Sequence, residues 1–467
     1  MNKAILLAAC LFGQAAIAQT TVDIPIDEAS VIARRALFAG ETELALQIAR
    51  GLLQVNPDDR EALLLVAAGA PRVGQATQGR IAGARAYRLA QNDIQAYEAA
   101  RLTALAAANE ERFTLSTFWL RRALIYVPND SERERTLADA RTVRRANPWS
   151  TSIGFSVAPS NNVNGGVDDA DGGTVGVLTQ TFSADAVAQP GVRASLNFGT
   201  SYRFHESPVD RASVSLQYQA ARVKLRDEVV ENPFYEAAIQ SGRSTEGIAE
   251  TVQLDAAQFG LDYLSVGVSY DRALEIGTVG VRYDTGLLEF GEERIYDFNR
   301  ATLSFSRALT EDTTLQLVGR REIQEHENEN TGQVRRTTLI AGLSYRLGNG
   351  DRISTSYTKL DSESESINYT YDEWSWEVGY GWAEPIGPVS VSVSAGIKRA
   401  DYPSYFLSFA DGRQDEGYFY GIELDFPEFE YAGFSPGISI QGTDTESNVS
   451  RFTRNSISTQ LTINSAF

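Results

Sequence analysis

Histidine and cysteine are the residue types with which this chain could do acid–base, metal or nucleophilic chemistry, and both are scarce. The sequence has two histidines, His205 and His326, and one cysteine, Cys10. His205 opens the turn-like segment 205–208, and His326 stands between two glutamates at an expected loop tip. A histidine beside a carboxylate or hydroxyl group could act as an acid, a base or a metal ligand. Neither histidine lies in a recognisable catalytic constellation, so we expect no enzymatic activity.

Charge is distributed unevenly along the chain. Residues 151–467 contain 45 acidic and 24 basic side chains, whereas residues 21–150 are close to neutral. An acidic surface repels the phosphate backbone, so nucleic acid is not an expected partner. The acidic residues suit loops and a lumen that face water. No glycine-rich, phosphate-holding loop precedes an expected helix, and we therefore expect neither ATP use nor a cofactor.

Residues 1–18 have the three parts of a secretory signal peptide. Lys3 is positive, residues 4–12 form a short apolar core, and residues 16–18 supply the small side chains of a cleavage site. The alternative is a lipoprotein cleavage box at residues 7–10, which would leave a lipid-modified Cys10 at the new N-terminus. We prefer cleavage after residue 18 because the apolar core before Cys10 is unusually short. The mature chain then has no cysteine, which excludes disulfides and thiolate sites.

The stretch from about Asp27 to Ala146 has the composition and apolar spacing of helices. Two breaks rich in Asn, Pro and Asp contain Pro57 and Pro128, which lie 71 residues apart. This distance is close to two tetratricopeptide (TPR) repeats of about 34 residues each. We predict a periplasmic TPR-like helical domain over residues 19–148. A surface that binds a peptide or protein is favoured over a simple spacer.

After Trp149 the composition shifts to Gly, Ser, Thr, Tyr and Phe, and hydrophobicity alternates with a period of two. Residues 374–382, 389–398 and 418–426 show this most clearly. The polar face consists of Ser, Gly, Gln, Glu and Arg, which suits a water-filled lumen better than a packed core. The mature chain also lacks an apolar run of about 18 residues, so it could span a membrane only as a closed barrel.

Two further features favour a membrane barrel over a soluble sheet. Aromatic residues gather towards strand ends, as at membrane interfaces. We assign this interfacial position to Trp374, Trp376, Trp382, Tyr418 and Tyr420. The last strand places an apolar series on one face, which resembles the signal read by the outer-membrane barrel-assembly machinery. Its members are Ile457, Leu461, Ile463 and the terminal Phe467.

The turn pattern predicts an outer-membrane barrel over residues 149–467 with about fourteen strands, counted from Thr174 onwards. A further strand at 149–158 would require another in 245–259 and give sixteen, because such barrels have even strand numbers. Short turns are expected near 309–312, 348–350, 385–388 and 427–428. Long acidic loops are expected near 290–297, 324–334, 361–371, 402–415 and 444–453, with 227–259 as the largest. Short turns are periplasmic in such barrels, which places the C-terminus in the periplasm.

The segment 152–164, Ser-Ile-Gly-Phe-Ser-Val-Ala-Pro-Ser-Asn-Asn-Val-Asn, resembles the start of the barrel domain in the Slam family, the surface lipoprotein assembly modulators. The order of signal peptide, helical repeats and barrel is similar to that family over nearly the whole chain. The signature positions are Pro159, Asn161, Asn162 and Asn164. From the residues alone, they form a tight turn at the domain junction. The alternative is a polar contact with a client protein or with the lumen.

The expected protein is thus α+β, with an all-α TPR-like repeat domain followed by an antiparallel transmembrane β-barrel. The resemblance implies a translocator for a client protein, either a lipoprotein or a secreted soluble protein. The helical domain would receive the client, or a periplasmic chaperone that carries it, and the barrel would conduct it. Other expected partners are outer-membrane lipid and the assembly machinery, and we expect a monomer. The alternative is a passive porin or a polysaccharide-export barrel, although such exporters carry longer repeat arrays.

Overall fold

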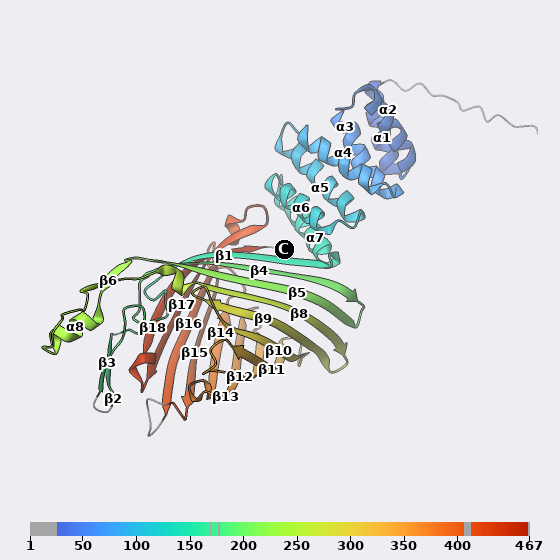
Figure 1. Ribbon diagram of the computed structural model, residues 1–467. Helices are drawn as coiled ribbons and strands as arrows, with labels where there is room; N and C mark the ends of the chain where they lie inside the picture. Colours follow the sequence, from blue (N-terminus) through green and yellow to red (C-terminus); the bar gives the residue numbers. More distant parts are fainter. Residues whose placement is uncertain (1–25, 169, 176–177, 406–411, 466–467) are drawn as a thin grey trace, which may run out of the picture. The chain divides into compact units, whose positions relative to one another are not determined.

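The computed structural model describes residues 26–168, 170–175, 178–405 and 412–465 (Figure 1). The expected signal peptide and the terminal Phe467 lie outside these residues. The chain divides into two compact units, Met1–Thr136 and Leu137–Phe467, which are described in turn. Every helix in the described part of the chain is too short or too polar to cross a lipid bilayer.

The first unit is a series of helices joined by short connections, and the last of these helices continues into the second unit. The helices are α1 (Ile26–Ala39), α2 (Thr42–Val55), α3 (Arg60–Gly69), α4 (Ala76–Arg88), α5 (Asp93–Asn109), α6 (Phe113–Ile125) and α7 (Asp130–Ala146), with a 3₁₀ turn, η1, at Ala70–Val73. Side chains cap every second helix: Asp59 accepts from the backbone N–H of Ala62 at 3.1 Å, and Asn92 from that of Gln95 at 3.0 Å. Asn129 begins α7 in the same way. These caps recur at nearly regular intervals, as a repeated helical hairpin requires.

Small side chains let these helices approach closely. The core between α1 and α5 is rich in alanine, including Ala33, Ala49 and Ala99, which are fully buried. Ion pairs join residues of successive hairpins: the Nε of Arg80 lies 2.5 Å from the Oε2 of Glu110. The hydrogen bond from Arg80 holds the pKa of Glu110 below its usual value. Packing and charge pairing therefore act together along the series.

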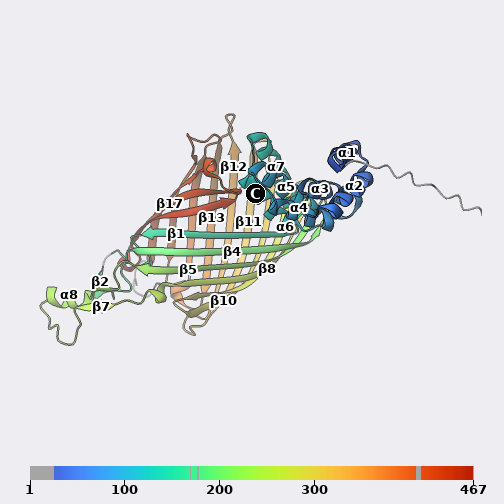
Figure 2. The ribbon, with the colours of Figure 1, turned by 90° about the horizontal axis from the view of Figure 1, so that it is seen from above.

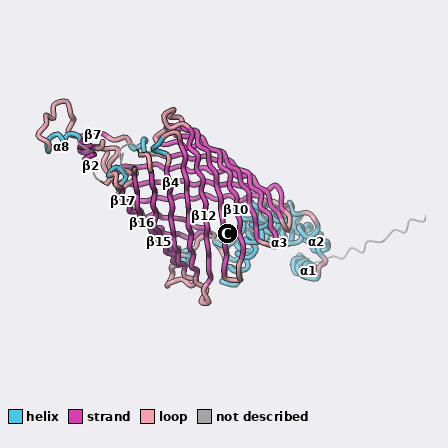
Figure 3. Tube along the Cα trace, turned by 90° about the horizontal axis from the view of Figure 1, so that it is seen from below, coloured by secondary structure: helices cyan, strands magenta, loops and turns pink. Residues whose placement is uncertain are grey.

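Fourteen strands of the second unit form a closed antiparallel barrel (Figures 1 and 3). In chain order they are β1 (Trp149–Ser160), β4 (Gly191–Glu206), β5 (Asp210–Leu225), β8 (Leu261–Leu274), β9 (Gly277–Phe290), β10 (Glu293–Ala308), β11 (Thr313–His326), β12 (Gln333–Arg346), β13 (Arg352–Ser364), β14 (Tyr371–Gly381), β15 (Ser390–Tyr402), β16 (Arg413–Asp425), β17 (Phe434–Ser447) and β18 (Arg454–Ser465). The barrel closes because β1 pairs with β4 on one side and β18 on the other. This architecture confirms the α+β expectation and the number fourteen.

The membership of the barrel differs from the prediction in two places. The strand at Trp149 belongs to the wall, whereas the stretch near Thr174 forms β2 (Asp171–Val175) and β3 (Leu178–Thr181), a separate sheet. The strand required in 245–259 for a count of sixteen exists as β7 (Thr251–Gln253). It pairs only with β6 (Val229–Glu231), outside the barrel. The prediction therefore counted the right number of strands from the wrong starting point.

Two insertions distinguish one end of the barrel from the other. Residues 161–190 follow β1 and contain β2 and β3, while residues 226–260 follow β5 and contain β6, α8 (Pro233–Gln240), β7 and a 3₁₀ turn, η2 (Ala256–Phe259). Figure 2 shows α8, β2 and β7 at the same end of the barrel. The largest expected loop, 227–259, is thus an insertion with structure of its own. Short 3₁₀ turns also lie in the loops after β13, β16 and β17, namely η3 (Ile367–Tyr369), η4 (Pro427–Phe429) and η5 (Ser450–Phe452).

The expected long loop at 290–297 is wrong. Strands β9 and β10 are joined by Gly291 and Glu292 alone, with φ angles of 62° and 69°. Two successive positive φ angles match the twist of a two-residue hairpin, but a glutamate rarely adopts them. The connections around Pro385 and Pro427 are also longer than expected, because they span 382–389 and 426–433.

Exposed apolar side chains on the strands share one face. Val266, Val268 and Tyr270 alternate with Ser265, Gly267 and Ser269 on β8, and the first three are exposed. An apolar face that points away from the lumen is the face that meets lipid in a transmembrane barrel. The period-two pattern read from the sequence therefore divides lipid from lumen.

We predict opposite effects for two glycine-to-alanine substitutions in the helical unit. A Cβ at Gly83 on α4 would lie 2.4 Å from the Oγ1 of the fully buried Thr103, whereas Gly51 on α2 has open space. Gly83→Ala should destabilise the unit by roughly 1–3 kcal/mol through overpacking. Gly51→Ala should stabilise it by up to about 1 kcal/mol through helix propensity. Thermal unfolding of the helical circular dichroism signal in the full-length protein measures both; equal effects would contradict the tight α4–α5 contact.

Candidate functional site

The asparagine-rich segment after β1 is a tightly hydrogen-bonded turn. Asn162 is 7% exposed, its Nδ2 donates to the carbonyl oxygen of Gly166 at 2.8 Å, and its Oδ1 accepts from the Gly166 N–H at 2.8 Å. The Nδ2 of Asn164 donates to the carbonyl of Val187 at 2.7 Å, and its Oδ1 accepts from the N–H of Gln189 at 2.8 Å. Both side chains hold backbone that would otherwise lack partners. They take the turn-forming role that was one of the two sequence interpretations.

Asn161 makes a different contact, across the closing seam of the barrel. Its Oδ1 accepts from the backbone N–H of Ile457 on β18 at 3.1 Å. Nearby, Asp168 accepts from the backbone N–H of Asn455 at 2.9 Å. Sequence reasoning singled out Asn161 but not Asp168, because the partner of each lies almost three hundred residues away. A turn-rich segment next to the first strand was the signal available.

The seam between β1 and β18 has a sparse backbone ladder. Along its whole length, β1 pairs with β4, but within the described residues its register with β18 rests on Val157 opposite Leu461 and Ser160 opposite Ser458. Pro159 lies between these two pairs and has no N–H to donate. The side chains of Asn161 and Asp168 thus replace part of the strand pairing at this end of β18.

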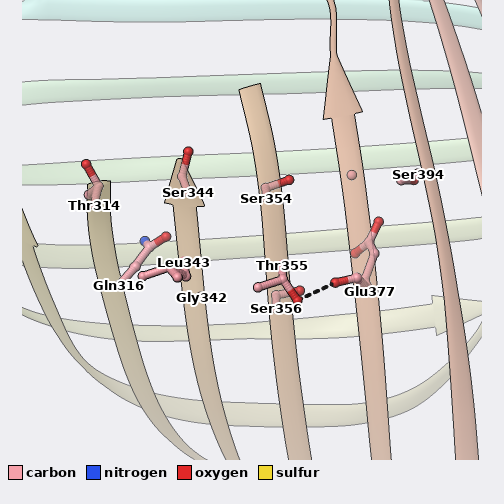
Figure 4. Close-up of a pocket in the computed structure, with 11 residues that line it drawn as sticks. Thr314, Gln316, Gly342, Leu343, Ser344, Ser354, Thr355, Ser356, Glu377 and Ser394 are labelled. Carbon is pink, nitrogen blue, oxygen red and sulfur yellow. Dashed lines mark hydrogen bonds between the residues drawn. The ribbon is translucent and has the colours of Figure 1, made fainter. Parts of the chain in front are cut away.

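A hydroxyl-rich hollow lies on the lumen wall near the ends where β11 and β13 begin (Figure 4). Its volume is about 260 Å³. The polar side chains that line it include Thr314, Gln316, Ser344, Ser354, Ser356, Glu377 and Ser394. Figure 4 shows them projecting from neighbouring strands β11–β15. Small neutral hydroxyl groups, which offer weak and interchangeable hydrogen bonds, predominate on this wall, and Glu377 is the charged group among the residues that line the hollow.

A charged and aromatic layer lines the lumen nearer the loop ends of β8–β12. The Nη2 of Arg282 lies 2.6 Å from the Oδ1 of Asp284, and the Nε of Arg300 lies 2.5 Å from the Oε2 of Glu322. Phe298, only 1% exposed, stacks on Tyr263 with ring centroids 5.5 Å apart. Sequence reasoning missed this layer, although the Arg-x-Asp spacing at 282–284 already placed both charges on one strand face. The two ion pairs, Arg282–Asp284 and Arg300–Glu322, form a charged ridge on the lumen wall.

The expected interfacial aromatics lie on the lipid-facing parity of their strands or just beyond. Trp376, Tyr418, Tyr420 and Trp382 are exposed, whereas Trp374 is half-buried and stacks on Tyr357. Trp376 and Tyr418 lie near the middle of β14 and β16 rather than at strand ends. Three residues of the expected assembly signal are exposed on the same face of β18, namely Ile457, Leu461 and Ile463. The interfacial and assembly roles remain predictions.

Both histidines make contacts that hold the strands. The Nε2 of His205 lies 2.7 Å from the Oδ1 of Asp210 across the β4–β5 turn, and Ser207 bonds to that carboxylate rather than to the histidine. His326 is half-buried, and the aromatic rings of Tyr296 and Tyr369 lie close to its imidazole ring. No three metal-binding side chains gather among the residues that the structure describes.

We predict that two asparagine variants loosen different parts of the seam. Asn162→Ala should leave the Gly166 N–H and carbonyl unpaired, at a local cost of roughly 1–3 kcal/mol, and so raise amide exchange in 161–168. Asn161→Ala should instead raise exchange at Ile457 on β18. Hydrogen–deuterium exchange with mass spectrometry distinguishes the two peptides. Identical exchange profiles for both variants would mean that the side chains do not have these separate roles.

Comparison with known proteins places the barrel in a family. Residues 192–467 match the surface lipoprotein assembly modifier (SlipAM) family. This range runs from β4 to the end of the chain, so it covers more than half of the sequence but not the segment 152–164 that carried the sequence resemblance. No curated protein matches the chain.

Several solved structures resemble the chain loosely. OccAB4 of Acinetobacter baumannii is 10% identical, with a TM-score of 0.31 over 68% of this chain and 97% of that one. OccK7 (OpdD) of Pseudomonas aeruginosa is 11% identical, with a TM-score of 0.32 over 68% and 97%. A loop-deleted OmpT of Vibrio cholerae is 10% identical, with a TM-score of 0.35 over 68% and 99%. All three superpositions are loose.

The family match and the closed barrel with its apolar outer face agree with each other. They confirm the resemblance to the Slam family and locate the protein in the outer membrane. The chain belongs to the surface lipoprotein assembly modifier family.

Proposed function

We propose that this protein moves a client protein, in the first instance a surface lipoprotein, across the outer membrane. The observation that carries the proposal is the family match over the barrel, residues 192–467. It is supported by the closed barrel with its polar lumen and by the unit of helical hairpins that precedes this barrel in the same chain. The barrel would conduct the client and the helical unit would receive it.

The lumen wall suits passage of an extended polypeptide. Near the short turns it presents hydroxyl groups such as those of Ser344, Ser354 and Ser394, which can bond to any peptide group without holding one strongly. Farther along, the Arg282–Asp284 and Arg300–Glu322 pairs form the charged ridge. A client would therefore meet a wall rich in hydroxyl groups first and a wall with paired charges later.

The helical unit suits capture of the client in the periplasm. The chain enters β1 and leaves β18 at the end opposite the large insertions 161–190 and 226–260. Large insertions face outside and short turns face the periplasm in such barrels, which supports a periplasmic position for the helical unit. A TPR-like surface tethered to a barrel raises the effective concentration of the client at that barrel.

The proposal requires no enzymatic step. The remaining partners would be outer-membrane lipid along the apolar face and the barrel-assembly machinery, which would read the exposed Ile457, Leu461 and Ile463 during insertion. A periplasmic chaperone could deliver the client to the helical unit. One chain closes one barrel, so a monomer suffices.

The proposal predicts that deletion of residues 27–146 separates barrel insertion from client display. The native host is compared in three forms: with the full-length gene, without it, and with the deleted gene. Intact cells are treated with protease, and the lipoproteins removed from their surface are identified by mass spectrometry. We expect one or a few lipoproteins to lose surface exposure in both mutant strains, while their total amounts persist.

Two controls make the result interpretable. The truncated barrel must reach the outer membrane, which heat-modifiable migration of the membrane fraction tests, and unrelated surface proteins must keep their exposure. Full surface display with the truncated barrel would refute the capture role of the helical unit. An unchanged surface in the strain without the gene would refute the translocator proposal itself.

A further inference from the structure

A row of lumen-facing residues crosses five strands at the loop end of the barrel. Strand register places Ser375 on β14 opposite Lys398 on β15, and Lys398 opposite Gly417 on β16. Gly417 in turn lies opposite Thr445 on β17, and Thr445 opposite Arg454 on β18. Two cations therefore flank a glycine and a threonine in one continuous line. Because side chains alternate, every member of the line faces the lumen.

Glycine at position 417 gives this row its space. A Cβ there would lie 2.9 Å from the Cε of Lys398 and 3.1 Å from the Oγ1 of Thr445. The lysine side chain thus passes over the bare glycine towards the threonine. A cavity of about 240 Å³ opens at this point, and Lys398, Thr445 and Arg454 all line it.

Among the described residues, the threonine hydroxyl and the two cations of the row have no hydrogen-bond or ion-pair partner. Thr445 is 3% exposed, and its Oγ1 has no hydrogen-bond partner. Among the described residues, no carboxylate lies within ion-pair distance of Lys398 or Arg454, although such pairs hold many other arginines of this barrel. A buried hydroxyl without a partner is costly, and here it points into a cavity that two cations share.

The neighbouring carboxylates do not fill this need. Asp415 is engaged by Arg413, whose Nε lies 3.0 Å from both carboxylate oxygens. Phe452 covers the same guanidinium, 3.2 Å from its ring centroid. Glu373 lines the cavity but lies opposite Ala400, in the next row towards the loops. It is the single acidic group left to compete with a bound anion among the residues that line the cavity.

We infer that Lys398, Thr445 and Arg454 form a binding site for a small oxyanion of the phosphate class. The ammonium and guanidinium groups would each donate charge-assisted hydrogen bonds, and the threonine hydroxyl would donate the bond that it lacks. The anion would neutralise two cations that otherwise face one cavity. Phosphate in solution and the phosphate of a lipid headgroup share this chemistry. The inference is independent of the translocator proposal.

The test measures phosphate binding to the purified full-length protein in a neutral detergent. Isothermal titration with inorganic phosphate is compared with chloride at equal ionic strength. We expect saturable binding of one phosphate per chain. Glycerol 3-phosphate, titrated in parallel, represents the lipid headgroup; tighter binding than inorganic phosphate identifies a headgroup as the source, and weaker binding identifies the free ion.

Single substitutions in the site should change the affinity for phosphate in opposite directions. Lys398→Gln and Arg454→Gln should each weaken phosphate binding about tenfold or more, because each removes a hydrogen bond between charged groups. Thr445→Val should weaken it less, and Glu373→Gln should tighten it. Lys359→Gln is the matched control, since Lys359 pairs with Asp372 at 2.6 Å on the outward-facing parity of β13.

Three results would overturn the inference. They are the absence of saturable phosphate binding, unchanged affinity in both Lys398→Gln and Arg454→Gln, and an equal loss in Lys359→Gln. Heat-modifiable migration checks that each variant forms a barrel. If Lys398→Gln fails to fold, Arg454→Gln and Glu373→Gln still decide the question, because the inference requires them to change affinity in opposite directions.

Discussion

Closure of the sheet is the constraint on which this barrel depends, because a bilayer core offers no partner for an unpaired backbone N–H or C=O. Thirteen of the fourteen joints between neighbouring strands are made by strands that follow one another in the wall, and these joints have long ladders, two of them with a local register shift. The last joint must bring together β1 and β18, the first and last wall strands of the chain. Among the described residues, it is also the joint with the sparsest backbone pairing.

Closure also fixes what the lumen contains. Once the register of each pair is set, a lysine on β15, a glycine on β16, a threonine on β17 and an arginine on β18 fall into one line. The same register brings Arg300 on β10 against Glu322 on β11. Many of the polar contacts in this barrel therefore arise between strands, where residues that are distant in sequence meet side by side.

Because such contacts form between strands, the sequence alone could predict only part of the fold and of the site. Period-two alternation at 374–382, 389–398 and 418–426 was sufficient for the strands there and for the membrane face, because each depends on local pattern. The family resemblance came instead from the segment 152–164 and from the order of the domains. The Gly291–Glu292 hairpin was missed because a glutamate with positive φ gives no sign of a tight turn. A pattern within one strand does not state the register of its neighbour. It therefore could not predict the lumen row that contains Lys398, Thr445 and Arg454, or the partners of Asn161 and Asp168. The turn at Asn162 was predictable because its bonds are local. Asn164 instead bonds to residues 21 to 25 positions away, which the sequence does not indicate.

The need to close the sheet in one register explains the asparagine-rich signature after β1. A shift of one residue between β1 and β18 would turn the side chains of a whole strand to the wrong face of the wall. Sparse backbone pairing around Pro159 leaves that register weakly specified by the ladder alone. Asn161 and Asp168 bond to alternate backbone N–H groups of β18, those of Ile457 and Asn455, and so mark one register. Asn162 and Asn164 then hold the turn that carries both clamps. At the seam, side chains thus fix the strand register that long backbone ladders fix elsewhere in the barrel.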